Sequence, residues 1–124
     1  MSSTTEEVGT GTNLFIAGSL QGTARWFIET ADVLSIDDDD LEDTIAFVSK
    51  GGMTFLSPIL PDLKAIVCEA GSRESHLAIL CREAAVPCIL AADLRGTVDN
   101  GDLVVLDLSD RETARISKAA TVTV

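Results

Sequence analysis

The sequence is poor in aromatic residues and basic residues and has no long apolar run. Each shortage excludes a kind of core, binding partner or membrane segment. Aromatic side chains make up 4% of the 124 residues against 46% hydrophobic residues, so the core must be aliphatic. Nine lysines and arginines against 20 aspartates and glutamates give a net charge of -11, which argues against general binding to nucleic acids or anionic membranes. No apolar run approaches the roughly 20 residues that a membrane-spanning helix needs.

Cysteine is also scarce, and its pattern does not suggest a metal site. The three cysteines, Cys68, Cys81 and Cys88, lie in apolar surroundings and form no C-x-x-C pair. Their odd number and the absence of a secretory segment at the start of the chain predict reduced thiols, and we expect a cytoplasmic protein. The single histidine would complete a set of four zinc ligands, but the cysteines look like core residues, and we expect no bound metal.

Two further segments resemble ligand-binding motifs only in part. The acidic run Asp37–Asp40, followed by Leu41-Glu42-Asp43, lacks the central glycine and the terminal glutamate of a calcium loop. It is more typical of a solvated turn or the start of a short helix. The pair Gly51-Gly52 is followed neither by Gly-Lys-Ser/Thr nor by a dinucleotide-binding fingerprint, so it is not a phosphate-binding loop.

Short apolar runs separated by polar turns predict several strands and one clear helix. The predicted strands are Asn13–Ser19, Gly22–Glu29, Thr44–Ser49, Ala65–Cys68, Val86–Leu90, Leu103–Leu106 and Thr113–Ile116. The first two look like a hairpin or adjacent strands. A short irregular helix is predicted over Met53–Leu63, which contains two prolines. A regular helix is predicted after residue 76, where apolar residues recur at helical spacing.

These elements predict an α/β fold, in which a parallel or mixed sheet is covered by helices in a single compact domain. The polar, Ser/Thr/Gly-rich residues 1–12 are predicted to form a flexible N-terminal tail. The domain is expected to span residues 13–117. Residues 118–124 are expected to be a C-terminal tail.

The single histidine, His76, lies between a predicted strand and the predicted helix. A histidine in the first turn of a helix is close to unpaired backbone N–H groups and to the positive end of the helix dipole. A phosphoryl group on its imidazole would find hydrogen-bond donors there, and Ser72, Ser75 and either Arg73 or Arg82 would add more. Neutral imidazole is a competent nucleophile near neutral pH. Spacing alone is equally compatible with a surface histidine that has no function.

The residues around His76 carry a resemblance to a known family. Val67–Pro87 resembles the swivelling phosphohistidine domain of PEP-utilising enzymes, whose signature reads approximately G-G-x-T-S-H-A-A-I-x-A-R-E-x-G-I-P-A. The matching positions, with Val86 in place of the isoleucine, are Gly71, Ser75, His76, Ala78, Ile79, Arg82, Glu83 and Pro87. Gly22–Arg25 and Asn100–Asp107 resemble flanking segments of the family, so the similarity extends from about Leu14 to Ile116.

The resemblance implies a β/β/α swivelling fold and a role for His76 as a phosphoryl carrier. It implies that Gly71, Ser72, Arg73, Ser75 and Arg82 stabilise the phosphoryl group. It also implies two partners, an ATP-grasp nucleotide-binding subunit and an acceptor-site subunit, as in multi-subunit enzymes of the phenylphosphate synthase type, or the corresponding domains on the same polypeptide if the chain is a fragment. Mg²⁺ and ATP, or PEP, would bind to those partners, and this chain would bind no cofactor itself.

Departures from the family pattern include Ser72, Glu74, Leu77, Ala85 and Ala91, and the last two stand where glycines are usual. The carboxylate of Glu74 would repel a phosphorylated imidazole and raise the pKa of the free one, or it would instead point at solvent or orient the ring, and Glu74 is expected to modulate the site. A second hypothesis therefore stands beside the carrier role, namely a non-catalytic docking or regulatory module.

Overall fold

Three parallel strands form the part of the structure on which the candidate site is built. The computed structural model describes residues 5–27, 32, 34, 37–49, 59–70 and 76–119. Strand β3 (Thr44–Val48) pairs in parallel with β4 (Ala65–Cys68), and β4 pairs in parallel with β5 (Cys88–Leu94). Every residue of β3 and β4 is buried, which explains why these segments read as continuous apolar runs.

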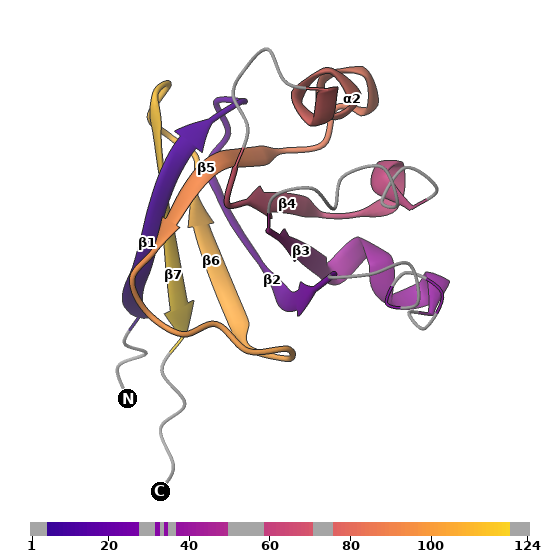
Figure 1. Cartoon of the computed structure of the whole chain (residues 1–124), viewed down its shortest axis with the longest axis horizontal. Helices are drawn as coiled ribbons and strands as arrows, with labels where there is room; N and C mark the ends of the chain where they lie inside the picture. The colour runs from indigo at the N-terminus through magenta and orange to yellow at the C-terminus, as the bar shows by residue number, and fades with distance from the viewer. Residues whose placement is uncertain are drawn as a thin grey trace, which may run out of the picture.

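The remaining strands close the sheet into a barrel. They are β1 (Thr5–Asn13), β2 (Ser19–Trp26), β6 (Leu103–Asp107) and β7 (Thr113–Ala119). The strand order is β1-β5-β4-β3-β2-β6-β7, and β7 pairs with β1 to complete the ring (Figure 1). The prediction of an α/β swivelling β/β/α domain is therefore wrong, because the seven described strands form a closed, mostly antiparallel barrel with one described α-helix.

Alternation along the parallel strands divides the core into two clusters. Ile45 and Phe47 of β3 point into the barrel, whereas Ala46 and Val48 point outward. The outer cluster is covered by helix α2 (His76–Ala84) and by the 3₁₀ turns η1 (Asp38–Asp43) and η3 (Leu60–Asp62), all on one side of the barrel (Figure 1). The helix and the two 3₁₀ turns thus cover the outward face of the three parallel strands. The sheet curves into a barrel, and the inward face of these strands is buried in its interior.

The chain ends and the first two strands differ from the predictions. Strand β1 begins at Thr5, so residues 5–12 are part of the barrel and not of a flexible tail, and β7 continues to Ala119, two residues beyond the predicted domain end at 117. The predicted hairpin is wrong, because β1 pairs with β5 and β7 while β2 pairs with β3 and β6. Both partners of β1 lie far along the chain, which local patterning cannot reveal.

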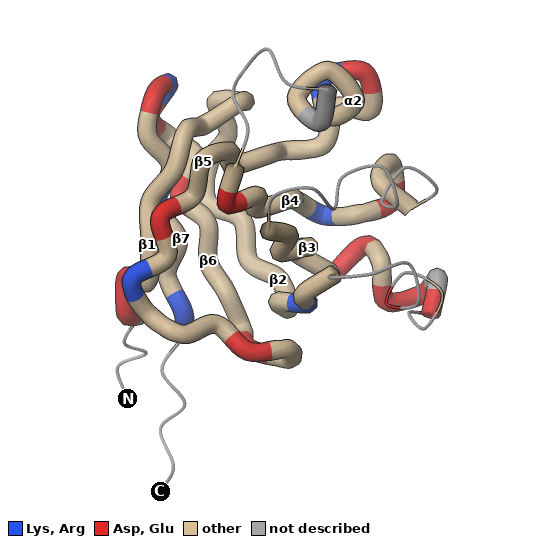
Figure 2. The backbone as a smooth tube through the Cα atoms, in the orientation of Figure 1, with Lys and Arg blue, Asp and Glu red and all other residues tan. Residues whose placement is uncertain are grey.

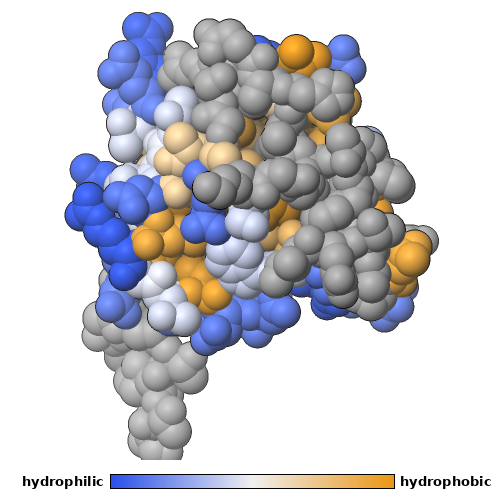
Figure 3. Space-filling view, in the orientation of Figure 1, coloured by the Kyte–Doolittle hydropathy of each residue, from blue (hydrophilic) through white to orange (hydrophobic). Residues whose placement is uncertain are grey.

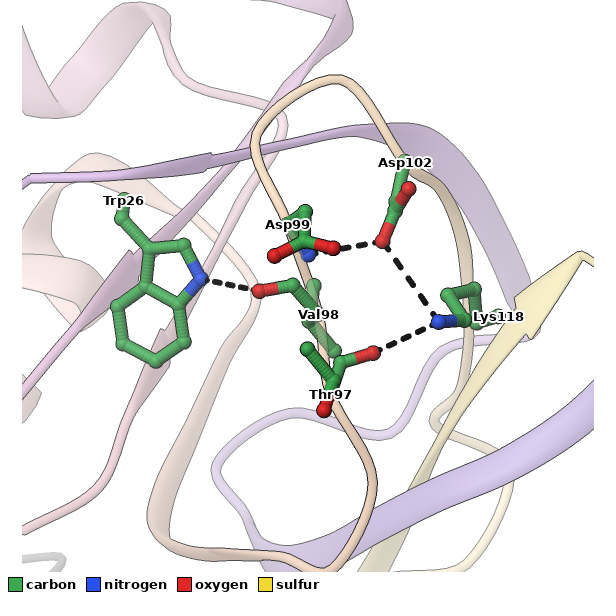
Figure 4. Close-up of polar contacts among 6 residues, drawn as sticks. All are labelled: Trp26, Thr97, Val98, Asp99, Asp102 and Lys118. Atoms are coloured by element: carbon green, nitrogen blue, oxygen red, sulfur yellow. Dashed lines mark hydrogen bonds and ion pairs between the residues drawn. The ribbon is translucent and has the colours of Figure 1, made fainter.

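A loop seals the barrel end that lies away from α2. The indole Nε1 of Trp26 donates a hydrogen bond to the carbonyl oxygen of Val98 over 2.7 Å (Figure 4). The ammonium group of Lys118 donates to the carbonyl oxygen of Thr97 over 2.8 Å and lies 3.8 Å from the Asp102 carboxylate. These contacts join β2, β7 and the loop before β6, and we assign them to the fold.

No described helix is both long and apolar enough to cross a membrane.

Candidate functional site

The candidate site lies where β4 leaves the sheet and α2 begins. Strand β4 ends at Cys68, the chain bends through Glu69 and Ala70, and α2 starts at His76. The structure therefore places His76 at the first position of the helix, and of this residue it describes the backbone. The other predicted site residues of the turn, Gly71, Ser72, Arg73, Glu74 and Ser75, lie outside the described residues.

The chain that leads into this turn is fixed by hydrogen bonds to both neighbouring strands. The backbone N–H of Glu69 donates to the carbonyl oxygen of Val48 over 3.0 Å, which prolongs the pairing with β3. On the other side, the N–H of Ala91 donates to the carbonyl oxygen of Ala70 over 3.1 Å. The start of the turn is therefore held between β3 and β5.

Ala91 makes this bond because it is the extra residue of a β-bulge. The pairing of β1 with β5 jumps from Thr12 opposite Leu90 to Thr10 opposite Asp93. Ala91 has a φ of 49°, a left-handed conformation that alanine adopts at a cost in energy. The bulge turns the N–H of Ala91 away from β1 and toward Ala70.

The C-terminal end of α2 is closed by a Schellman motif. The N–H of Val86 donates to the carbonyl oxygen of Cys81 over 2.9 Å, and the N–H of Ala85 donates to that of Arg82 over 3.3 Å. Ala85 has a φ of 57°, as this motif requires of the residue after the helix. Val86 and Cys81 are both buried in the outer cluster, so the helix is anchored where it ends.

The backbone of α2 gives its N-terminus an electrostatic preference for anions. The first N–H groups of a helix have no intrahelical partner, and the helix dipole adds a partial positive charge. The first turn of α2 contains no acidic residue. Arg82 lies in the last turn, six residues after His76 and thus about 9 Å along the axis. Its contact with a phosphoryl group stays a prediction.

Three thiols lie between α2 and the sheet, one on α2, one on β4 and one on β5. Cys68, Cys81 and Cys88 are buried in the outer cluster. A hydrogen bond from the Cys88 thiol to the Cys81 sulfur, together with burial, raises the pKa of Cys88 well above its usual range, and the same bond lowers the pKa of Cys81. Burial raises the pKa of Cys68. In the described part of the chain, no three His, Cys, Asp or Glu side chains form a group suited to a metal ion.

Comparison with known families gives an independent assignment. Residues 42–111 match the family described as PEP-utilising enzyme, mobile domain, and this stretch covers more than half of the chain. The chain belongs to this family. The match includes β4, the turn before His76 and all of α2. No curated protein sequence matches this PEP-utilising mobile domain.

Two solved structures are similar to this PEP-utilising mobile domain in fold. An MccF-like protein from Bacillus anthracis str. Ames aligns with a TM-score of 0.58 and 12% identity, over 97% of this chain and 53% of its own. This chain thus spans about half the length of that protein. A UPF0107 protein, solved in solution by NMR, aligns with a TM-score of 0.52 and 18% identity, over 90% of this chain and 97% of its own. At these identities the likeness concerns the barrel-like fold alone.

The link between Ala91 and Ala70 was not predicted from the sequence, although a signal for it was present. Both alanines with a left-handed backbone, Ala85 and Ala91, stand where the family usually has glycine. A position that prefers glycine is often one that needs a positive φ. The two positions that prefer glycine are thus the end of α2 and the bulge of β5.

Proposed function

We propose that this PEP-utilising mobile domain carries a phosphoryl group on His76 between a donor and a small-molecule acceptor. The observation that supports the proposal best is the start of α2 at His76, separated from the end of β4 by residues 69–75 and inside the stretch that matches the family. The N–H groups at the start of a helix suit the oxygens of a phosphoryl group.

The proposed chemistry consists of two substitutions at phosphorus. In the first, a ring nitrogen of neutral His76 attacks the donor phosphorus, an N–P bond forms, and the P–O bond to the donor breaks with its electrons on the leaving oxygen. In the second, an acceptor oxygen attacks the same phosphorus, the N–P bond breaks, and the imidazole is restored. The proton of the acceptor hydroxyl passes to a base on the acceptor subunit.

This chain would supply stabilisation of charge. Backbone N–H groups of the turn at residues 71–75, the side chains of Ser72 and Ser75, and the guanidinium of Arg73 or Arg82 would donate to the phosphoryl oxygens. Donors that are fixed before the reaction need no reorganisation, and the bonds that hold Ala70 and the helix end would serve this purpose.

The donor and the acceptor would bind to other subunits or domains. We expect an ATP-grasp nucleotide-binding partner, with Mg²⁺ and ATP or PEP bound to it, and a separate acceptor-site partner. Such a division suits a domain whose own candidate site offers a nucleophile and anion donors.

Labelling tests the proposal directly. The protein is incubated with its purified nucleotide-binding partner and β- or γ-labelled ATP, and we expect a label on this chain that acid removes and base does not. His76→Ala should carry none, and Ser109→Ala, at an exposed position between β6 and β7, should label like the wild type. An unlabelled wild-type chain, or a label that persists in His76→Ala, contradicts the proposal.

A second candidate function rests on Glu74, which replaces the threonine of the family signature. A carboxylate next to the histidine disfavours a phosphorylated imidazole and suits a docking or regulatory module without catalysis. In that case a folded His76→Ala protein would still support the activity of the partner. Loss of that activity in His76→Ala would exclude the docking role.

A further inference from the structure

We propose that the outward side of α2 and η3 is the docking surface for the phosphoryl-donating partner, which inserts an apolar side chain from a basic surface. The inference rests on the proposed function. A shallow groove of about 310 Å³ separates the two elements, and Leu60, Pro61, Leu80, Glu83 and Ala84 line it. We call this hollow the α2 groove. It is mostly apolar and open to the outside.

Helical spacing places the α2 groove on the same side of the helix as residue 76. Leu80, Glu83 and Ala84 follow His76 by four, seven and eight residues, and residues at these intervals share one side of a helix. Along the axis the groove begins about 6 Å from residue 76. The opposite side of α2 packs inward through Ala78 and Cys81, which are fully buried.

Ile79 extends this apolar surface beyond the groove. It lies one turn after His76, and 45% of its surface is exposed. The exposed part of this isoleucine is not buried in the core beneath α2. Its burial against a partner would remove apolar surface from water and so stabilise the complex. Hydrophobic surface is visible over α2 at the upper right of Figure 3.

Charge identifies the kind of partner. Described acidic residues outnumber basic ones on the helical side of the barrel (Figure 2). The acidic residues there are Asp37, Asp39, Asp40, Glu42, Asp43, Asp62, Glu69 and Glu83, and the basic ones are Arg25, Lys64 and Arg82. Glu83 lines this apolar groove and Asp62 belongs to η3 beside it, so the groove fits an apolar side chain surrounded by lysine or arginine. A second copy of this chain would bring the same acidic residues, so self-association is disfavoured.

The place of the groove agrees with the task of the domain. A donor site must come into contact with position 76, and a partner that does so covers the neighbouring turns of α2. A contact within about two helical turns of the histidine would orient the transfer without contacting the reacting atoms.

Photo-crosslinking and binding test the inference. p-Benzoylphenylalanine is introduced at Ile79 and, as a matched control, at Leu103, which is 41% exposed on β6. In extracts of the source cells, position 79 should crosslink to a nucleotide-binding protein, which is then purified.

The affinity of this purified partner for the protein should fall about 30-fold with Ile79→Asp and stay within about twofold with Leu103→Asp. Glu83→Lys should weaken binding about tenfold, and added salt should weaken wild-type binding.

The outcomes separate this inference from the proposed function. If Ile79→Asp, with a native circular dichroism spectrum, binds the partner like the wild type, or if position 79 yields no specific crosslink, the docking surface is wrong even where His76 is labelled. If Ile79→Asp loses the partner but wild-type His76 takes no label, the surface stands and the carrier role fails. A wild-type dimer that Ile79→Asp dissociates would make a second copy the occupant and overturn the inference.

Discussion

The backbone N–H of Ala91 donates a hydrogen bond to the carbonyl oxygen of Ala70, with 3.1 Å between nitrogen and oxygen. This bond joins the bulge of β5 to the residue that precedes the turn before His76. Ala91 adopts a left-handed conformation to make it. The start of the candidate site is thus fixed by a strained residue that is 21 positions away in the sequence from Ala70.

Replacing Ala91 with glycine should stabilise the protein. Ala91 is exposed, so the lost methyl group contributes little packing, and glycine adopts a φ of 49° without a clash. We expect about 1 kcal/mol of added stability and a melting temperature about 3–6 °C higher. Thermal and urea unfolding measure this. Ala92→Gly, at the buried next position, should be destabilising, and a stability loss in Ala91→Gly would show that the bulge is not strained.

Ala85→Gly should stabilise the end of α2 in the same way. Ala85 has a φ of 57° and is exposed, and glycine is the residue that a Schellman motif prefers. The expected gain is again about 1 kcal/mol. Ala85 and Ala91 lie in different elements, so the gains should add in the double variant. Ala84→Gly, at the last residue of α2, serves as the control: Ala84 has no left-handed φ to relieve, so this change should not stabilise the protein.

The buried thiols should make stability fall in alkaline solution. Burial raises the pKa of Cys68, so the folded chain keeps a proton that the unfolded chain releases above about pH 8.5. The contribution of the Cys68 thiol to the free energy of unfolding is therefore fully present below about pH 8.5 and is lost as the pH rises further. Urea unfolding at pH 7.5 and pH 10 should show the fall, and Cys68→Ala should reduce it. If the stability of Cys68→Ala falls between pH 7.5 and pH 10 as much as that of the wild type, the raised pKa of Cys68 is not the cause.

Asn13→Ala should be strongly destabilising. The side chain of Asn13 is 1% exposed, and its Nδ2 donates to the carbonyl oxygens of Leu108 over 3.0 Å and Asp110 over 2.6 Å. Removal leaves these oxygens without that donor, and we expect a loss of about 2–3 kcal/mol in urea unfolding. Asn100→Ala is the control. The Oδ1 of Asn100 accepts a hydrogen bond from the backbone N–H of Trp26, and because Asn100 is exposed, water would take its place in the variant. Equal losses in both variants would argue against the role of burial.

Glu74→Thr, which restores the residue of the family signature, should favour phosphorylation of His76. Removing a carboxylate near the phosphoryl group lowers the repulsion by about 1 kcal/mol, which corresponds to about fivefold more phosphorylated protein at equilibrium. Labelling with the purified donor partner measures this. Glu112→Thr, in the β6–β7 loop, should change nothing. Unchanged labelling in Glu74→Thr would mean that this carboxylate points away from the imidazole.

The positions of strands were predictable from the sequence where a strand is largely buried and therefore reads as an apolar run. The segments predicted at Thr44–Ser49, Ala65–Cys68 and Leu103–Leu106 correspond to β3, β4 and β6, because apolar runs bounded by turn residues have few alternatives. The helix after residue 76 was predictable for a similar reason, since its buried positions recur at helical spacing. The polar, glycine-rich residues of β1 predict a tail, because their side chains alone do not indicate a strand.

By itself, the sequence determined the strand, turn and helix around His76 and the membership of the family, because both depend on residues that are neighbours in the chain. Only the tertiary structure decided that the sheet closes into a barrel, and that Ala91 holds Ala70. These features depend on pairings such as β1 with β7, between residues about 100 positions apart. Loop closure and strand register set such pairings, and neither is encoded in a local pattern.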